Sequence, residues 1–389
     1  MTKSKSAKVA VFLVAGLCCS ATSLKPACGQ SHGDGFHVED VLPGAVLQGQ
    51  NYRIADRVTV EAYEYLFTVD SDFGQFEARG RDVLNLRLRE LKSIEAAKEL
   101  AKDPHLVNGI LGPLENTSKG VELLIRQPLE TLGSMPKGFG LMVNQFLDPA
   151  DRRAGSLERR RLAGELDCDP ETRNPVLKKL LDDMSLQQGG GGLLTKAAMS
   201  FVPGLSLLPT TAEMKEMIAS NPPSVINGQI DKKLQAAGVD KSLRSRFCKS
   251  KAFTTVERLL LMHQFKAVAG VSGRASLIEA ATHADTEADA LATIRAGKMI
   301  ADLGERKTIR ELTFVGLPMA VLGDGTHAII CPYDYITNTE ELIQGVNAYR
   351  KSYPQVETTL VTTGGASAAA RRTLKAVRIE IVENRTAAP

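Results

Sequence analysis

The hydrophobic period changes twice along the chain, and these changes limit the folds that it can adopt. β-branched and aromatic residues dominate Tyr52–Gly80, apolar residues then recur at three- and four-residue spacing as far as Lys307, and the strand pattern returns from Leu312. A period near 3.6 predicts amphipathic helices, whereas alternating or β-branched runs predict strands. We therefore expect an α+β fold that is predominantly α-helical.

The first strand-rich segment, Tyr52–Gly80, is predicted to form a β-hairpin. Asp70–Gly74 (DSDFG) places turn residues between its two halves. A helix is predicted to follow over Asp82–Lys102, because its leucines and isoleucine share one face. Two more helices are predicted over 117–125 and 129–146.

The stretch Leu162–Leu181 contains turn and helix signals in close succession. Asp169 and Pro170 are typical of an N-cap and a first helical position, and Asn174-Pro175 begins the helix proper. Four glycines, Gly189–Gly192, end this helix and predict a flexible joint. No strand precedes the glycines and the lysine of a phosphate cradle is missing, which argues against a P-loop.

Glu213–Lys307 is predicted to be nearly all helix, with small residues that favour close helix packing. Breaks between its helices are expected at Asn221–Pro223, at Ala237–Asp240 and near Asp285-Thr286. From Leu312 a hairpin around Gly323–Gly325 precedes alternating helices and strands, which predicts a small α/β unit. Its expected elements are strands Thr313–Val321 and Ala328–Tyr335, helix Thr339–Tyr353, strand Val356–Thr363, helix Ser367–Lys375 and strand Arg378–Val382.

Residues 1–29 are predicted to be a secretory signal peptide. A basic start precedes an apolar core that is too short to span a bilayer: Lys3, Lys5 and Lys8, then Val9–Leu17. Cleavage is expected after Ala21 or Gly29. Cys18 and Cys19 raise the alternative of a lipoprotein, but the residues before them are not the small ones that lipidation needs. We expect an exported protein of the periplasm, cell envelope or surroundings.

We predict five segments. They are a signal peptide (1–29), a β-hairpin plus helices (30–188), a Gly-rich apolar joint (189–210), a helical domain (211–307) and an α/β unit (308–385). The joint contains the apolar stretch Gly189–Pro209, which fits either a buried helical hairpin or a membrane-surface segment. The Arg-rich stretch Asp148–Arg161 fits either a solvated helix face or a patch for anionic lipid or polyanions.

Charge and composition exclude several classes of function. Removal of residues 1–29 leaves 44 basic and 45 acidic residues, so no positive excess points to nucleic acid. Aromatic residues make up 5% of the chain and Trp is absent, which argues against a carbohydrate cleft lined with indole rings. Cys168, Cys248 and Cys331 remain, and an odd number leaves at least one without a partner in the chain. No metal-type spacing occurs, and no cofactor is predicted.

Four short motifs are distinctive in this sequence. The first is D-P-x-T-x-N-P-V-L at Asp169–Leu177; the others are FGQFEARG at Phe73–Gly80, RLRELKSI at Arg87–Ile94 and VTTGGASAA at Val361–Ala369. Together they resemble a set of exported bacterial proteins with no assigned function. The resemblance spans most of the chain after the signal peptide. It implies no activity and supplies no catalytic residues.

The predicted α/β unit contains the candidate residues for chemistry. Asp324, His327 and Asp334 are candidates for a hydrolytic group around one strand. Thr363, Gly364, Gly365 and Ser367 lie between a strand and a helix, where free N–H groups bind anions. A turn-capping role for His327 and an ordinary β–α turn are the alternatives.

The end of the chain also resembles restriction-endonuclease-like domains, in which a strand, a T-G-x-S/T-x-x-A turn and a helix recur. Those nucleases use an acid and a lysine on one strand to hold Mg²⁺ and activate water. The corresponding strand, Ala328–Tyr333, has neither, although Asp324 and Asp334 flank it. The resemblance therefore does not imply metal-dependent cleavage.

Three hypotheses follow. The leading one is a non-enzymatic binding or structural module that associates with an envelope protein or a membrane surface. The second is a hydrolase in the α/β unit, which requires Asp324, His327 and Asp334 or the Thr362–Ser367 turn to converge in one pocket. The third is membrane-surface association through Gly189–Pro209.

Overall fold

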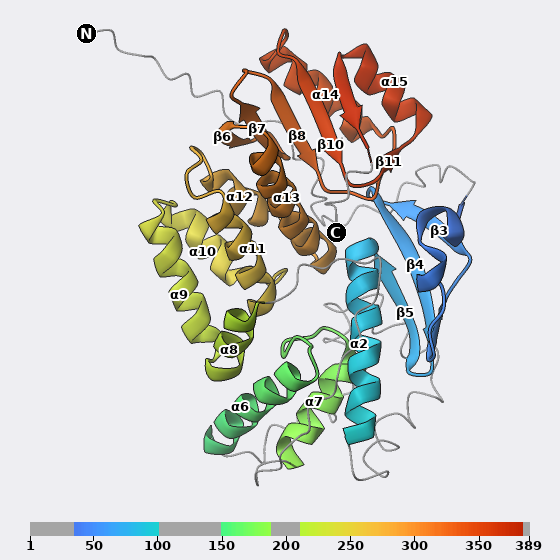
Figure 1. Ribbon diagram of the computed structural model, residues 1–389, viewed down its shortest axis with the longest axis vertical. Helices are drawn as coiled ribbons and strands as arrows, with labels where there is room; N and C mark the ends of the chain where they lie inside the picture. Colours follow the sequence, from blue (N-terminus) through green and yellow to red (C-terminus); the bar gives the residue numbers. More distant parts are fainter. Residues whose placement is uncertain (1–34, 101–148, 188–210, 384–389) are drawn as a thin grey trace. The chain divides into compact units, whose positions relative to one another are not determined.

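The computed structural model describes residues 35–100, 149–187 and 211–383 (Figure 1). They group into two compact units. The N-terminal unit contains the described residues up to 233 together with 253–260, and the C-terminal unit contains 234–252 and the described residues from 261 onward. The predicted fold class is confirmed, because the fold is α+β with helices predominating. The predicted helices 117–125 and 129–146 and the apolar stretch Gly189–Pro209 lie outside the described residues.

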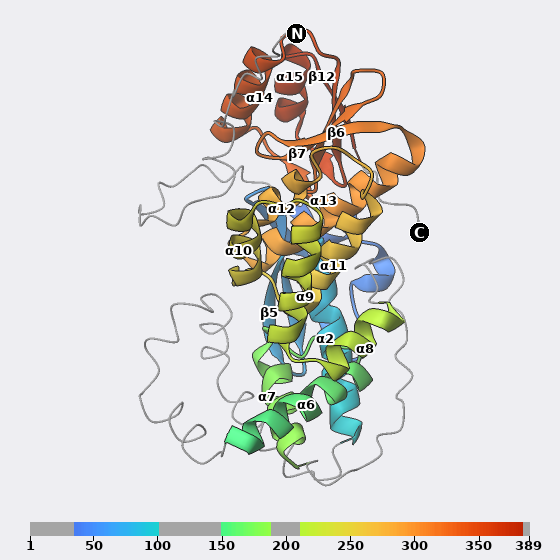
Figure 2. The same cartoon turned by 90° about the vertical axis from the view of Figure 1, so that its left-hand side faces the viewer.

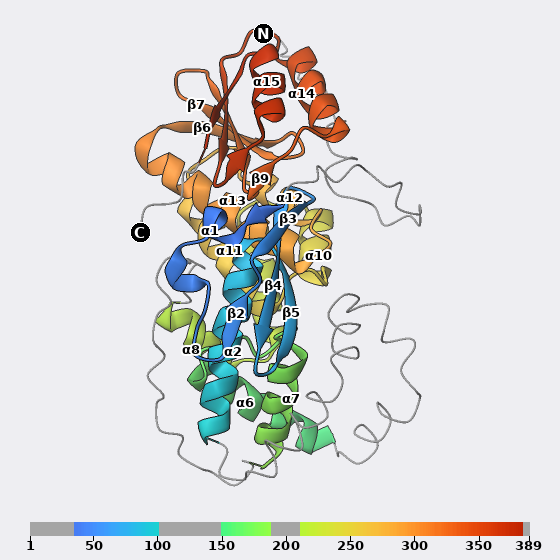
Figure 3. The ribbon, with the colours of Figure 1, turned by 90° about the vertical axis from the view of Figure 1, so that its right-hand side faces the viewer.

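An antiparallel sheet forms one layer of the N-terminal unit (Figure 3). Its strands are β1 (Phe36–His37), β2 (Tyr52–Ile54), β3 (Arg57–Glu61), β4 (Glu64–Ser71) and β5 (Gly74–Arg79). β4 pairs with β5 along one edge and with β2 and β3 along the other. The predicted hairpin is thus confirmed, with Ser71 opposite Gly74 at its turn.

Helices pack on this sheet and on one another. The short α1 (Val38–Val41) follows β1, and α2 (Arg81–Leu100) packs on β5 and on α7. The unit also contains α6 (Pro149–Glu165), α7 (Pro175–Gln187), α8 (Ala212–Ser220) and most of α9 (Pro223–Ala236). Leu84, Leu88 and Leu91 on α2 are buried, as their spacing predicts.

Two N-cap predictions near Leu162–Leu181 have different outcomes. The Asn174 side-chain oxygen accepts hydrogen bonds from the Val176 and Leu177 amides and so begins α7. Asp169 does not begin a helix, which corrects the prediction. Its carboxylate accepts the Glu171 amide across a turn, and the chain has no regular secondary structure from there to Asn174.

The C-terminal unit begins with helices α10 (Lys241–Lys249), most of α11 (Thr255–Ala267), α12 (Ala275–Ala281) and α13 (Glu287–Arg306). The predicted breaks are confirmed: Gly238 has φ +77° and Asp240 caps α10, while Thr286 and Asp289 form a capping box on α13. The predicted helical domain 211–307 does not form a unit of its own, since α8 belongs to the other unit.

A five-stranded sheet completes this unit (Figure 2). Its order is β12-β10-β8-β7-β6, formed by Ile379–Val382, Thr358–Thr362, His327–Cys331, Pro318–Leu322 and Ile309–Phe314. The first three strands run parallel and are joined by α14 (Glu340–Ser352) and α15 (Ala368–Ala376), whereas β6, β7 and β8 are antiparallel. Every residue of β7 and β8 is buried, so both faces of the sheet are covered there.

The expected strand Thr313–Val321 is divided by a turn. β6 ends at Phe314, Gly316 adopts φ +94°, and β7 starts at Pro318. A positive φ favours glycine. This turn makes β6 and β7 a hairpin. The sequence does not reveal the turn, because apolar residues lie on both sides of it.

Candidate functional site

The carboxyl ends of the parallel strands β8 and β10 meet, and ligand sites in α/β sheets gather at such ends. Asp334 follows β8, and Thr363 and Gly364 follow β10. Both chains continue as the short parallel pair β9 (Tyr335–Ile336) and β11 (Gly365–Ala366). The two segments cross so closely that a Cβ on Gly364 would lie 1.7 Å from the Asp334 carbonyl oxygen. Only glycine fits at this crossing.

Arg295, from the middle of α13, reaches these strand ends. Its Nη1 lies 2.7 Å from the Pro332 carbonyl oxygen and 3.3 Å from both Asp334 Oδ1 and Thr363 Oγ1. The Asp334 side chain is fully buried, so the guanidinium compensates a carboxylate that has lost its water. These contacts attach α13 to both strand ends, and they give Asp334 and Thr363 internal partners.

Several other polar groups of the predicted anion-binding turn also have internal partners. The Thr362 hydroxyl donates to the Tyr333 carbonyl oxygen at 3.1 Å and accepts the Gly364 amide at 3.2 Å. The Gly365 amide donates to the Asp334 carbonyl oxygen, and the Ser367 hydroxyl accepts the Ala370 amide at 3.1 Å as the N-cap of α15. The turn therefore uses these groups to build the strand–helix junction.

His327 lies at the other end of β8, in a buried chain of hydrogen bonds. The Thr358 hydroxyl donates to the Val356 carbonyl oxygen and therefore accepts from the Tyr349 hydroxyl at 2.8 Å. The Tyr349 oxygen is then the acceptor for His327 Nδ1–H, also at 2.8 Å. Burial lowers the pKa of His327, and the positive charges of Arg310 and Arg350 lower it further. The imidazole is thus held neutral, with its proton on Nδ1.

Asp324 is exposed in the turn before β8, where its carboxylate accepts the Thr326 amide at 2.9 Å and the Thr326 hydroxyl at 2.7 Å. These hydrogen bonds lower the pKa of Asp324. Between Asp324 and Asp334 lie the five residues of β8, a rise of roughly 15 Å. The structure therefore does not bring Asp324, His327 and Asp334 together in one site.

We predict that acid destabilises the fold through His327. A folded-state pKa below the ordinary value of ~6.5 means that only the unfolded chain takes up a proton as the pH first falls. Between pH 7 and pH 5 the wild type should lose up to about 2 kcal/mol of unfolding free energy relative to His327→Gln. Urea unfolding at both values measures this; a difference between the two proteins that is independent of pH would contradict it.

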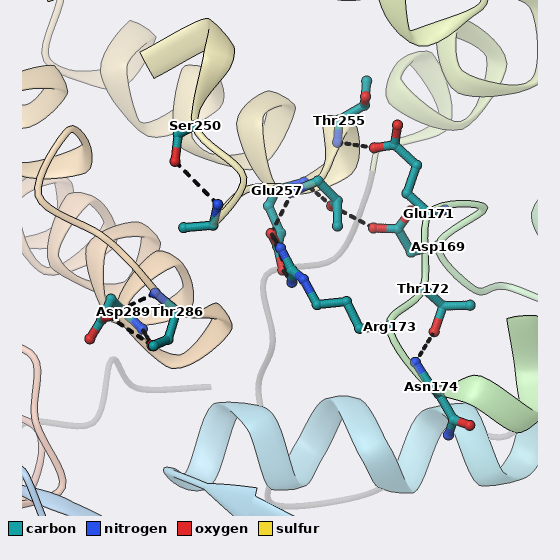
Figure 4. A network of polar contacts seen from close by, with 12 residues as sticks. Asp169, Glu171, Thr172, Arg173, Asn174, Ser250, Thr255, Glu257, Thr286 and Asp289 are labelled. Carbon is teal, nitrogen blue, oxygen red and sulfur yellow. Dashed lines mark hydrogen bonds and ion pairs between the residues drawn. The ribbon is translucent and has the colours of Figure 1, made fainter. Parts of the chain in front are cut away.

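The N-terminal unit contains a second polar cluster, around the loop 167–174 (Figure 4). Asp169 accepts the Thr254 hydroxyl at 2.6 Å and the Glu171 amide at 2.7 Å. Glu171 in turn accepts the Thr255 amide at 2.5 Å. Burial raises the pKa of Asp169 to about 6, although hydrogen bonds oppose the shift.

Thr172 fixes the same loop to α2. Its hydroxyl donates to the buried carboxylate of Glu90, which also accepts Arg87 Nη1 at 2.7 Å. Ser93, one turn later, donates to the Leu166 carbonyl oxygen at 3.0 Å. Two of the sequence motifs, Arg87–Ile94 and Asp169–Leu177, therefore meet in one hydrogen-bonded junction.

Arg173 and Glu257 form the third contact of this loop. Thr254 and Glu257 make a capping box at the start of α11, because Glu257 Oε2 accepts the Thr254 amide at 2.7 Å and Thr254 Oγ1 accepts the Glu257 amide at 3.2 Å. The same carboxylate pairs with Arg173 Nη1 at 3.2 Å and is only 6% exposed. Arg173 thus compensates a buried charge.

We predict that protonation of Asp169 makes the fold more stable in mild acid. An acid whose folded-state pKa is raised stabilises the fold at low pH, and this contribution is lost as the pH rises through about 6. From pH 7 to pH 5 the wild type should gain about 1 kcal/mol relative to Asp169→Asn, which cannot titrate. Denaturant titrations of both proteins test this, and an equal response to pH would contradict it.

The three cysteines, Cys168, Cys248 and Cys331, form no disulfide bond with one another, and the surroundings of Cys168 make its thiol unreactive. Burial, together with the neighbouring Asp169 and Glu90 charges, raises the pKa of the Cys168 thiol well above its usual range and so keeps it in the unreactive form. Within the described ranges, no three His, Cys, Asp or Glu side chains come together in a group that could hold a metal ion.

A small apolar pocket lies between α14 and the C-terminal sheet. Its walls are Val315, Leu317, Ile329, Glu341, Leu342, Gly345, Val346, Tyr349, Leu360 and Ile379. Its volume is only ≈ 40 Å³, and no polar group converges in it to orient a ligand.

Sequence reasoning missed Arg295, Glu90 and Glu257 as the residues that organise these clusters. Arg295 interrupts the apolar face of an Ala-rich helix, which is a usable signal, whereas Glu90 and Glu257 lie on helices already rich in charge.

In the part of the chain that the structure describes, no helix is both long and apolar enough to cross a bilayer. Comparison of the chain with protein-family models, curated proteins and solved structures finds no match.

Proposed function

We propose that this chain is a non-enzymatic, exported binding module that associates with the cell envelope. The main support for this proposal is that the candidate catalytic side chains make contacts that hold the fold together. Asp334 pairs with Arg295, His327 bonds to Tyr349, and Ser367 caps α15. Each group serves the architecture, and they lie at opposite ends of β8 rather than around a common reacting centre.

The N-terminal unit supports the same proposal. Asp169, Glu171 and Arg173 bond to residues more than eighty positions away, and Thr172 bonds to α2. A network of hydrogen bonds between distant segments restricts the arrangement of the backbone. A rigid frame of this kind suits a module that presents a surface to a partner.

The expected export segment, Lys3–Leu17, indicates the compartment in which the protein acts. A basic start followed by a short apolar core directs a chain to the secretory pathway. The exported chain then meets envelope proteins and the membrane surface, which are the partners that we propose.

Fractionation of the native exported protein tests this function. The membrane pellet is washed with low-salt buffer, then with about 1 M salt, then with alkaline carbonate. We expect the protein in the pellet after the low-salt wash. Recovery as a soluble monomer that sediments with no partner would contradict the proposal.

A further inference from the structure

Helix α10 and the two residues after it are strongly basic. The segment Lys241–Lys251 (KSLRSRFCKSK) contains five basic residues and no acidic one. Asp240, the single acid beside it, caps the helix by accepting the Ser242 amide at 2.7 Å. α10 therefore concentrates positive charge, although the chain without its predicted signal peptide is nearly neutral.

Three of these cations lie on one exposed face. At 100° per residue, Lys241, Arg246 and Lys249 fall within an arc of about 140°, and all three are exposed. Phe247 lies on the opposite side and is fully buried, and α10 packs on α12 (Figure 2). The basic face, which we define as Lys241, Arg246 and Lys249, thus points away from the core.

The charges of the basic face are not used within the fold. No carboxylate of the described residues lies within ion-pair distance of Lys241, Arg246 or Lys249. Other cations are paired: Arg159 bonds to Asp182, and Lys179 to Asp183. Arg244, on the same helix, donates to the Val239 carbonyl oxygen at 2.8 Å.

We propose that the basic face of α10 binds the surface of an anionic phospholipid bilayer. This proposal rests on the proposed envelope association and names the contact that provides it. A bilayer rich in acidic headgroups has a negatively charged surface. Binding to it requires only that several cations lie close together on the protein. Protein interfaces use exposed aromatic or aliphatic anchors, and single-stranded nucleic acid needs stacking rings. On α10, Phe247 is fully buried and Leu243 is half-buried, so neither forms such an anchor.

This contact is peripheral and sensitive to salt. The basic face has no exposed apolar side chain to insert, so attraction acts only within a Debye length, about 10 Å at 0.1 M salt. Each basic residue close to an anionic surface strengthens binding by about five-fold, and three of them give about a hundred-fold.

The test uses the full exported chain and vesicles of phosphatidylcholine with or without phosphatidylglycerol. Flotation at low and high salt measures the partition coefficient of the wild type and of Lys241→Gln/Arg246→Gln/Lys249→Gln. The matched control, Lys351→Gln/Arg372→Gln/Lys375→Gln, removes three exposed cations from α14 and α15 and changes the net charge equally. Thermal unfolding checks that both variants fold, and Lys241→Arg/Lys249→Arg keeps the charge.

We expect the wild type and the Lys→Arg protein to bind only the anionic vesicles, and only at low salt. The α10 variant should bind about a hundred-fold more weakly, and the control variant as the wild type does. Equal losses in the α10 and control variants would overturn the assignment, as would binding to pure phosphatidylcholine. Tighter binding to a DNA duplex than to vesicles would also overturn it. Failure on vesicles while the native protein still pellets with the envelope would overturn this inference alone.

Discussion

Gly364→Ala should unfold the carboxyl end of the C-terminal sheet. The added Cβ would meet the Asp334 carbonyl oxygen at 1.7 Å, its carbon at 2.3 Å and its Cα at 2.8 Å. All three are backbone atoms, so no side chain can rotate away and the strands after β8 and β10 must separate. The fully buried Asp334 carboxylate would then lose its place beside Arg295. We expect a loss of about 4 kcal/mol in unfolding free energy, more than the ~1–3 kcal/mol usual for overpacking because the clash is with backbone atoms.

A glycine in the same unit provides the control. Gly304 lies within α13, and a Cβ there would meet only Ile309 Cδ1, at an ordinary 3.5 Å. Gly304→Ala should therefore be neutral or stabilise by up to about 1 kcal/mol, since alanine favours helix. Chemical denaturation of the three proteins gives the comparison. Equal stability of Gly364→Ala and wild type would contradict the crossing described at Asp334.

Arg173→Met should destabilise the N-terminal unit by about 3 kcal/mol. The substitution keeps much of the side-chain volume but leaves the Glu257 carboxylate buried without its guanidinium. Removal of one partner from a buried pair leaves an uncompensated charge, which costs about 3–5 kcal/mol, and the 25% exposure of Arg173 places this pair at the lower end.

The second substitution isolates the charge from the helix cap. Glu257→Gln retains the capping box with Thr254, because glutamine also accepts the Thr254 amide. The double variant Arg173→Met/Glu257→Gln should therefore recover about 2 kcal/mol relative to Arg173→Met. Urea titrations complete the cycle. Additive effects of the two substitutions would contradict a charge-mediated contact.

Local signals in the sequence predicted most elements of the fold. The turn at Asp70–Gly74, the break at Asn221–Pro223 and the cap at Asp240 all lie where their residue types indicate. These features depend on backbone groups within a few positions, which a single sequence contains. Asp169 was misassigned because its carboxylate caps a turn and bonds to Thr254, and a partner 85 positions away leaves no local pattern.

The candidate site was harder to predict than the fold. Asp324, His327 and Asp334 are close in sequence, but a buried strand extends them along its length instead of gathering them. The residues that do gather, Arg295 and Asp334, come from a helix and a strand end 39 positions apart. Spacing predicts neighbours on a helix face, whereas contacts between elements depend on the tertiary fold.

The N-terminal unit closes with a piece of chain that is made late. Residues 253–260 belong to it, although 234–252 and the residues from 261 onward belong to the other unit. Asp169 finds Thr254 only after 85 further residues have been added. At typical synthesis rates of ~5–20 residues per second, the residues that bond to the 167–174 loop are therefore synthesised roughly 4–17 s after the loop itself. A polypeptide truncated after Lys233 would leave Asp169, Glu171 and Arg173 without them, so the first unit matures only once the second has begun to emerge.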